Sequence, residues 1–525
     1  MVTFFMMELV KKHIHRIRHR GSVTTQMTLD EDFNVPDSMD DVEQLILDSG
    51  EIQIESVKNQ TERAAVKGRM AFHILYRTPS GQVMTLAGNL PFEEKVNLPG
   101  MAETDYVRVS WELDDLNVGI INSRKLAVKA LVTLHVQAEM LEDADAAEDI
   151  RFDGNVETLK RTIEAAAMTV RRKDTFRIRE VLTLSGNRPD IDKLLWKDMK
   201  LRGVSTKPVD GKIQLHGELM VFFVYAGEDS QMPVQCFEEA ISFSGDVELD
   251  GVKETMIPFI TTKLIHKEME VNPDSDGEMR EISVDAVVEL DIRLYEEEQM
   301  ELLGDLYALD REILLENGTA CFDQIAARNM LKHKMQEKVR MPVGQRILQI
   351  CHSDAEVRVD EAQMKEDGLH IDGILEMKLL YLTAEDTAPV AAFTEMLPFH
   401  VTAEVSGVTE DCVYQMEPGL EQISAVMLGG DTVEIKAVVT MDILVLRPVC
   451  EPIITAVREE PLNMEKLKRM PGIVGYIVQP GDSLWKIARE FHSSVDEIMA
   501  ANQLKDRVIR PGEKLILVKS VGVGK

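Results

Sequence analysis

The chain has 525 residues, of which 44% are hydrophobic and 29% charged, and its formal net charge is −32. A chain of this length exceeds what one hydrophobic core can hold, so about three to five domains are expected. The acidic balance argues against a nucleic-acid partner, because phosphate binding needs a basic face. No segment approaches the roughly 18 consecutive apolar residues of a transmembrane helix, so we expect none.

The N-terminal segment is apolar from Met1 to Val10 and then basic from Lys11 to Arg20. A secretory signal has the reverse order, so we expect a cytoplasmic protein. Residues 1–23 are interpreted as a basic leader, either solvated or in contact with an anionic surface.

Five cysteines are widely spaced along the chain: Cys236, Cys321, Cys351, Cys412 and Cys450. They are odd in number and lack the spacing of a zinc site. We predict five reduced thiols and no metal site.

One segment occurs three times, each time as a glycine, an alternating apolar run and a tyrosine at the same offset: Gly68–Arg77, Gly217–Ala226 and Gly373–Leu382. A second alternating run, rich in β-branched residues, closes each copy: Leu126–Gln137, Ile282–Tyr295 and Val433–Arg447. Period-two alternation predicts strands with one apolar face. We therefore expect a multidomain, mainly β protein with three related repeats, built as sandwiches or open barrels.

The repeated glycine and tyrosine have a structural and a functional interpretation. They could form a ligand-binding stripe along the repeats. However, a strand glycine often marks a close approach, and a tyrosine that ends a strand often packs its ring. We predict a structural role for both.

The connections between the copies, 153–174 and 320–338, have the composition of helices. The expected organisation has seven parts: the basic leader (1–23), repeat 1 (24–150), a helical connector with repeat 2 (151–318), a helical connector with repeat 3 (319–450), a linker (451–472), a C-terminal module (473–519) and a tail (520–525).

Catalytic motifs are missing from the sequence, which contains no GxSxG, HExxH or GxxxxGK[ST] pattern. The segment Asn272–Ser283 imitates the start of an EF-hand, but its twelfth position is Ser283 where a bidentate glutamate is required. We read this segment as an acidic hairpin turn, and we predict no enzymatic activity and no cofactor.

The C-terminal module is predicted to follow the order strand, helix, helix, strand. Tyr476–Val478 forms the first strand, and Asp482 or Ser483 is placed to cap the first helix. Ser494 to Glu497 reads as a capping box that opens a second helix. Leu515–Val518 is the last strand.

These residues resemble a LysM domain, in the pattern from Gly481 to Leu484, in Ile487–Ala488, in Asn502 and in Pro511–Gly512. The resemblance implies binding of an N-acetylglucosamine polymer, peptidoglycan or chitin, in a shallow groove between two loops. The candidate binding residues are Gly481, Asp482, Ser483, Leu484, Trp485, Asn502, Leu504, Val508, Ile509 and Arg510. For Trp485 three interpretations stay open: packing on the module itself, stacking on a sugar, and anchoring a protein partner.

Three acidic β-repeats followed by a LysM module resemble the SipL-like family of clostridial spore morphogenesis proteins, with their SPOCS-domain repeats. The likeness extends along the chain from Met7. It implies a scaffold on the outer forespore surface in the mother cell, whose LysM module binds the coat-basement ATPase, stage IV sporulation protein A. A cell-wall or cortex protein that binds peptidoglycan is the alternative.

Overall fold

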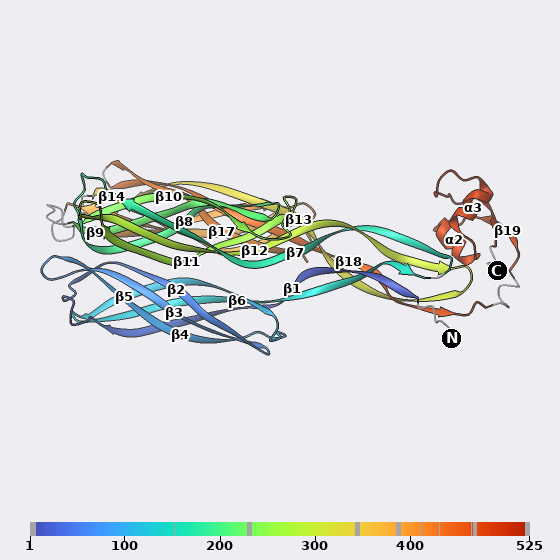
Figure 1. The fold of residues 1–525 in the computed structure, drawn as a ribbon, viewed down its shortest axis with the longest axis horizontal. Coiled ribbons are helices and arrows are strands. Elements are labelled where there is room, and N and C mark those ends of the chain that lie inside the picture. Colours follow the sequence, from blue (N-terminus) through green and yellow to red (C-terminus); the bar gives the residue numbers. More distant parts are fainter. Residues whose placement is uncertain are drawn as a thin grey trace.

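The computed structural model describes residues 7–152, 154–227, 234–341, 347–384, 390–409, 411–429, 431–463, 465 and 470–519. The chain within these ranges consists mainly of β-strands, with two short helices near the C-terminus. Figure 1 shows a broad β-rich body that narrows into a stalk, with the C-terminal module at the far end. The start of the expected leader, 1–6, and the expected tail, 520–525, lie outside the described residues.

Each repeat consists of six strands in two antiparallel three-stranded layers that enclose a common core, which makes it a sandwich. In repeat 1 the layers are β2-β3-β4 and β1-β6-β5, and the other repeats use the same order. One bridge between β7 and β13, at Ala166 and Asp323, joins the outer layers of repeats 2 and 3 into a six-stranded sheet. The strands of repeat 1 are β1 (Glu8–Asn34), β2 (Gln44–Gln60), β3 (Arg63–Arg77), β4 (Val83–Asn97), β5 (Tyr106–Asn122) and β6 (Lys125–Arg151). Those of repeat 2 are β7 (Val156–Thr183), β8 (Ile191–Val209), β9 (Lys212–Gly227), β10 (Gln235–Glu248), β11 (Ile257–Pro273) and β12 (Met279–Ala308). Those of repeat 3 are β13 (Glu312–Arg340), β14 (Ile347–Lys365), β15 (Gly368–Thr383), β16 (Val390–Glu404), β17 (Val413–Gly429) and β18 (Thr432–Glu460).

The repeated glycine has a structural role, as predicted. Each one lies directly opposite a phenylalanine of the next strand, in the pairs Gly68 with Phe92, Gly217 with Phe243 and Gly373 with Phe399. A Cβ atom at Gly68 would lie 2.7 Å from the Phe92 ring and 2.6 Å from the carbonyl oxygen of Gln53. The glycine therefore makes room for the aromatic ring.

The repeated tyrosines, Tyr76, Tyr225 and Tyr381, have buried rings. The Tyr76 hydroxyl donates to the backbone oxygen of Asp40 over 3.1 Å, in the segment that leads into β2. These contacts confirm the structural interpretation, because the hydroxyl ties the end of the central strand to the entry of its own repeat.

The stalk is made of three two-stranded ribbons, because the outer strands of every repeat continue far beyond its sandwich. The ribbons pair β1 with β6, β7 with β12, and β13 with β18. Side chains from all six strands meet in one core: Ile14, Ala144, Ala146, Ala165, Met300, Leu302, Ala320, Phe322 and Ile453. The stalk thus repeats the threefold organisation of the body, with one ribbon from each repeat.

The helical connectors predicted at 153–174 and 320–338 are wrong, because these segments belong to strands β7 and β13. Their alanine content favours a helix in isolation. In the stalk, however, Ala165 and Ala320 are small enough to let three ribbons approach one another around Phe322. Tertiary packing overrides the local propensity here.

The basic leader predicted for residues 1–23 is also a strand, since β1 begins at Glu8. Its positive side chains face acidic partners on neighbouring strands. Arg16 lies 3.8 Å from Glu142, Lys12 lies 2.5 Å from Glu298, and Arg20 lies 3.6 Å from Asp105. The leader is therefore part of the stalk, and its charges are largely compensated within the chain.

Two further expectations need correction in repeat 3. Strand β18 runs to Glu460, so the first ten residues of the expected linker 451–472 belong to the stalk. Cys321 and Cys450 face each other across β13 and β18 and are joined by a disulfide, so the prediction of five reduced thiols is wrong for this pair. Cys236, Cys351 and Cys412 are free.

The three repeats also meet in the middle of the body. Leu75, Val224 and Leu380 occupy the same position after the repeated glycine, and all three are buried in one cluster.

The acidic turn predicted at Asn272–Ser283 is a hairpin between β11 and β12, closed by the hydrogen bond from the Asp274 amide to the Glu278 backbone oxygen at 2.8 Å. No helix in the described part of the chain is long and apolar enough to cross a membrane.

Candidate functional site

The C-terminal module has the predicted order of strand, helix, helix and strand: β19 (Ile473–Ile477), α2 (Leu484–Glu490), α3 (Val495–Asn502) and β20 (Lys514–Val518). Ser483 caps α2, because its hydroxyl accepts from the Lys486 amide. Ser494 and Glu497 form the predicted capping box of α3. Both helices bury one apolar side against the two-stranded sheet.

The first candidate binding loop is held in place by its own polar groups. Gly481 has a φ of +90°, which favours glycine at this turn. The Asp482 carboxylate accepts from the Gln479 amide at 2.8 Å and from the Tyr476 hydroxyl at 2.7 Å. These bonds hold the pKa of Asp482 below its usual range. Asp482 therefore shapes the loop, while Leu484 is buried in the core.

The second candidate loop follows α3. Asn502 fastens it to β20, since its amide donates to the Ile516 oxygen and its oxygen accepts from the Ile516 amide. Leu504 and Ile509 pack against the core of the module. Val508 is 72% exposed, and Arg510 is also exposed. Of the ten candidate residues, Gly481, Ser483, Val508 and Arg510 are the ones whose surfaces are open.

Trp485 points at the stalk and not into a free groove. Its indole nitrogen donates to Asp305 of β12 at 2.7 Å, and its ring meets Tyr307 edge to face, with the ring centroids 4.9 Å apart. Arg489 binds the same Asp305 carboxylate at 2.8 Å. The sequence alone did not reveal Asp305, Tyr307 or Arg489, because these contacts join segments far apart in the chain.

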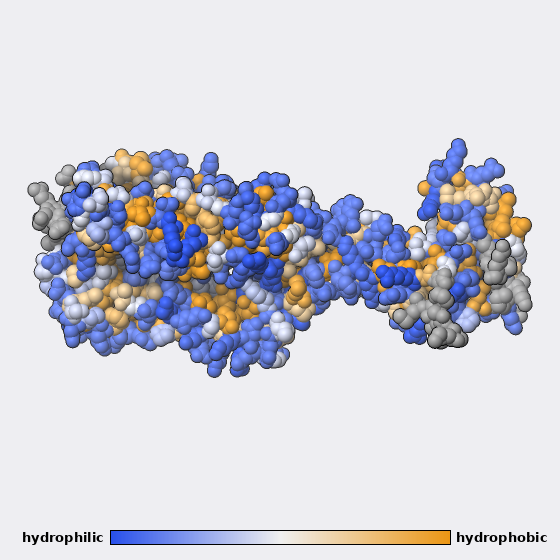
Figure 2. Space-filling view, in the orientation of Figure 1, coloured by the Kyte–Doolittle hydropathy of each residue, from blue (hydrophilic) through white to orange (hydrophobic). Residues whose placement is uncertain are grey.

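An apolar face covers the outside of the two-stranded sheet. Val474, Tyr476, Leu515 and Leu517 point toward the helices, and alternation turns the residues between them outward. The outward set is Ile473, Gly475, Ile477, Lys514, Ile516 and Val518, so this face is apolar except for Lys514. Ile473 is 69% exposed and Ile516 is 52% exposed. Figure 2 shows hydrophobic surface over β19 at the right-hand end of the molecule.

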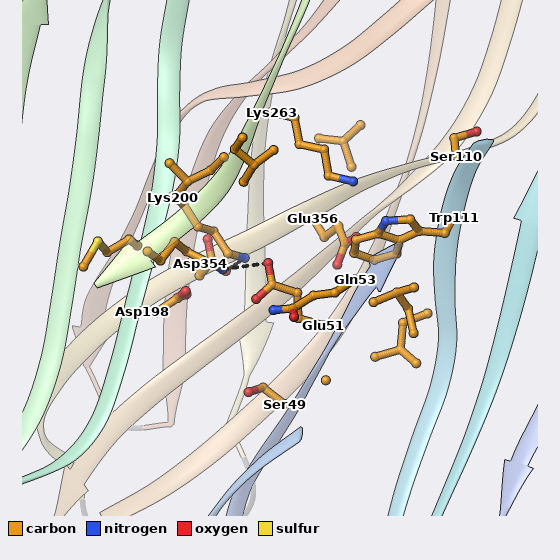
Figure 3. A pocket seen from close by; sticks show the side chains of 18 of the residues that line it. Ser49, Glu51, Gln53, Ser110, Trp111, Asp198, Lys200, Lys263, Asp354 and Glu356 are labelled. Atoms are coloured by element: carbon orange, nitrogen blue, oxygen red, sulfur yellow. Dashed lines mark hydrogen bonds and ion pairs between the residues drawn. The ribbon is translucent and has the colours of Figure 1, made fainter. Parts of the chain in front are cut away.

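A cavity of about 1550 Å³ lies between the three repeats and is lined by strands that include β2, β5, β8, β11, β14 and β17. Charged side chains from different repeats meet across it, as shown in Figure 3. Lys267 of repeat 2 lies 2.9 Å from Glu51 of repeat 1, and Arg358 of repeat 3 donates to the Leu113 oxygen of repeat 1 at 2.6 Å. The cavity wall thus holds the repeats together through ion pairs and hydrogen bonds.

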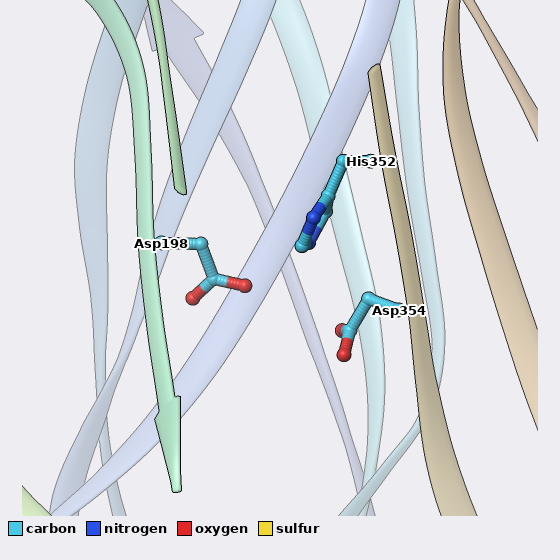
Figure 4. A group of neighbouring side chains, drawn as sticks. All are labelled: Asp198, His352 and Asp354. Carbon is cyan, nitrogen blue, oxygen red and sulfur yellow. The ribbon is translucent and has the colours of Figure 1, made fainter. Parts of the chain in front are cut away.

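One histidine and two aspartates in the cavity have the spacing of metal ligands: Asp198, His352 and Asp354 (Figure 4). Asp354 already pairs with Lys200 and with Arg202, and a cation would compete with these two positive charges. His352 is bound to Glu238 through Nδ1 and stacks on Phe222, with the ring centroids 4.0 Å apart. This arrangement is that of an ion-pair cluster between repeats 2 and 3.

The fold defines a class: a modular protein of three β-sandwich repeats whose stalk carries a small βααβ binding module. The family model for the SipL SPOCS domain matches residues 41–121, 190–272 and 346–428, and the LysM model matches residues 476–518. The chain therefore belongs to the SipL-type SPOCS-repeat proteins that end in a LysM domain, and it is a sporulation-related protein. Both domain families are non-catalytic. No curated protein and no solved structure matches the chain significantly.

Proposed function

We propose that the protein is a non-enzymatic scaffold of spore coat and envelope assembly. In this proposal its LysM domain binds stage IV sporulation protein A, the coat-basement ATPase, and so recruits the chain to the outer forespore surface in the mother cell. The three SPOCS repeats form the body that is carried there. The resemblance to SipL-type proteins supports this role.

The observation that carries the proposal is the apolar face of β19 and β20. Apolar side chains exposed side by side are typical of a surface that a protein partner covers. Ile473 lies directly opposite Val518 in the ladder, so these two side chains are neighbours on that face. A glycan would instead need several polar groups and a free aromatic ring, whereas the outward residues of β19 and β20 include one charged side chain, Lys514, and no aromatic ring.

The position of the module also supports binding to a large partner. The LysM domain sits at the end of the stalk, away from the body of the repeats (Figure 1). A partner that covers β19 and β20 there would meet little obstruction from the sandwiches.

The alternative function is binding of peptidoglycan or another N-acetylglucosamine polymer in the cell wall or cortex. It is favoured by the LysM match itself and by the open surfaces of Val508 and Arg510 in the second loop. The two functions predict different ligands for the same module.

One experiment separates them. The purified full chain is tested for capture by immobilised stage IV sporulation protein A and, in parallel, for pelleting with insoluble peptidoglycan. We expect capture by the protein and little pelleting, and an Ile516→Lys variant should lose most of the capture because it places a charge on the apolar face. Pelleting without capture would reject the scaffold proposal.

Leu348→Lys is the matched control. Leu348 is also an exposed apolar residue, at 53%, but it lies on β14 of repeat 3. The control should capture the ATPase as well as the unchanged chain does, whereas equal losses in both variants would contradict a contact at β19 and β20.

A further inference from the structure

The LysM domain is fastened to the stalk through its own core. Tyr307 of β12 is buried in the same cluster as Val478, Leu484 and Ile487 of the module. Its hydroxyl donates to the Ser493 oxygen at 2.8 Å, in the turn between α2 and α3. The stalk thus supplies a core residue to a domain that begins more than 160 residues later in the chain.

Charged groups reinforce this contact. Both oxygens of Asp305 lie 2.8 Å from Arg489, and one of them also accepts from the indole of Trp485. Bonds between charged groups are stronger than neutral ones, and losing one partner leaves the other unsatisfied. Glu157, opposite Tyr307 on β7, is an exception, because burial and the like charge of Asp496 raise the pKa of its carboxyl group.

The contact with the stalk occupies Trp485, which is the residue of the module best suited to bind a sugar. An indole that stacks on a sugar needs a free ring face, and its N–H can bind a sugar hydroxyl. In this structure Trp485 is half-buried, its N–H binds Asp305 and its ring contacts Tyr307. The apolar face of β19 and β20 is left open by the same contact.

We propose that the end of the stalk, where Asp305 and Tyr307 lie on β12, determines which class of ligand the LysM domain binds. Asp305 and Tyr307 hold the Trp485 side against the stalk and close it to N-acetylglucosamine polymers, which leaves the outer face of β19 and β20 for a protein. The choice of a protein as the remaining ligand rests on the proposed function, whereas the closure to glycans does not. Asp305 and Tyr307 are therefore specificity-determining residues, because they control whether the LysM domain can bind a glycan.

The test is pelleting of the full chain with insoluble peptidoglycan. The unchanged chain and Trp485→Ala should pellet equally little. The double variant Asp305→Ala/Tyr307→Ala should pellet at least about fivefold more, a coupling of ordinary size between two sites. Adding Trp485→Ala to the double variant should remove the gain, because the gain depends on the released indole.

A double variant in the ribbon of β13 and β18 serves as the matched control. Leu314→Ala/Glu316→Ala removes an apolar side chain and a carboxylate from β13, on the same stalk but outside the contact with the module. It should pellet like the unchanged chain. A similar gain in this control, or no gain in the Asp305/Tyr307 variant, would overturn the proposal.

A second measurement does not depend on how the double variant folds. In the full chain with Trp111→Phe and Trp196→Phe, Trp485 is the remaining tryptophan, and its fluorescence can be quenched with acrylamide. We expect protection in this chain, and quenching as fast as that of free indole would show that the module is not docked. Capture of stage IV sporulation protein A by the unchanged chain tests the proposed function separately, so the two can fail independently.

Discussion

The indole nitrogen of Trp485 lies 2.7 Å from a carboxylate oxygen of Asp305, a residue 180 positions earlier in the chain. This hydrogen bond connects the LysM domain to the end of repeat 2 and not to repeat 3, which directly precedes the domain in sequence. The domain is therefore placed by a contact with β12, and the segment that follows β18 has only to span the distance to β19.

Removing one hydroxyl should loosen this contact measurably. Tyr307→Phe loses the bond to the Ser493 oxygen while keeping the ring, which should cost about 1 kcal/mol, or about fivefold in the docking equilibrium. Trypsin cleavage within residues 461–472 should accelerate to a similar extent. Tyr414→Phe, which loses a comparable bond to the Ala362 oxygen in repeat 3, is the control and should leave the rate unchanged. An unchanged rate in Tyr307→Phe would contradict docking through this residue.

The repeated glycine should not tolerate a side chain. In Gly68→Ala the new methyl group would overlap the Phe92 ring and the Gln53 oxygen, and overpacking of this kind costs about 1–3 kcal/mol. Hydrogen exchange of the β3 amides should report the loss, and adding Phe92→Leu should restore part of it. Gly119→Ala, where no atom lies within 4 Å of the new group, should leave exchange as it is. Equal protection in both variants would show that the glycine is not needed for close approach.

The contact between repeats 2 and 3 should depend on pH through Asp354. Burial alone would raise its pKa, but the charges of Lys200, His352 and Arg202 hold the pKa of Asp354 below its usual range. A lowered pKa in the folded state stabilises the fold above the ordinary carboxylate pKa of about 4, and this stabilisation is lost as the pH falls below that value. Asp354→Asn should therefore lower the free energy of unfolding by roughly 3 kcal/mol at pH 7 and by much less at pH 3.

Urea unfolding at pH 7, 5 and 3 measures this difference. Glu254→Gln breaks an exposed pair with Lys207 and should cost under about 1 kcal/mol at each pH. A difference between Asp354→Asn and the unchanged chain that stays constant down to pH 3 would rule out the assigned ion pair.

The disulfide between Cys321 and Cys450 can be tested by counting free thiols. With the bond in place, the unfolded chain without reductant should titrate three thiols, and five after reduction. The two cysteines are separated by 129 residues, and closing a loop of that length stabilises a fold by about 4–5 kcal/mol. The double variant Cys321→Ser/Cys450→Ser should be destabilised by a similar amount. Five thiols without reductant would contradict the bond.

Much of the fold could be predicted because its signals are local. Alternation of apolar residues predicted the strands that contain Gly68–Arg77 and Leu126–Gln137, and the repeated glycine and tyrosine predicted three related β-domains. Capping residues such as Ser494 and Glu497 predicted the second helix of the LysM domain. Each of these signals depends on residues a few positions apart.

The stalk was not predicted, and its alanines explain why. The segment around Ala165 has a helical composition, and only the approach of two other ribbons makes a strand with small side chains the better solution. In the same way, the sequence showed a basic leader at Lys11–Arg20 but not the acidic strand that neutralises it. The partner of Arg16 and Arg18, Glu142, lies more than 100 residues away in the chain.

The sequence by itself determined that this protein consists of three β-repeats and a LysM domain, together with the inner strands that contain the repeated motifs and the helix caps of the LysM domain. Only the tertiary structure decided which surface of the LysM domain stays open. Its candidate residues are all present in the sequence, but the orientation of Trp485 depends on Asp305 and Tyr307 in a distant strand. The reason is physical: patterns of alternation and capping act between near neighbours, whereas the burial of an aromatic ring depends on whichever segment the fold places beside it.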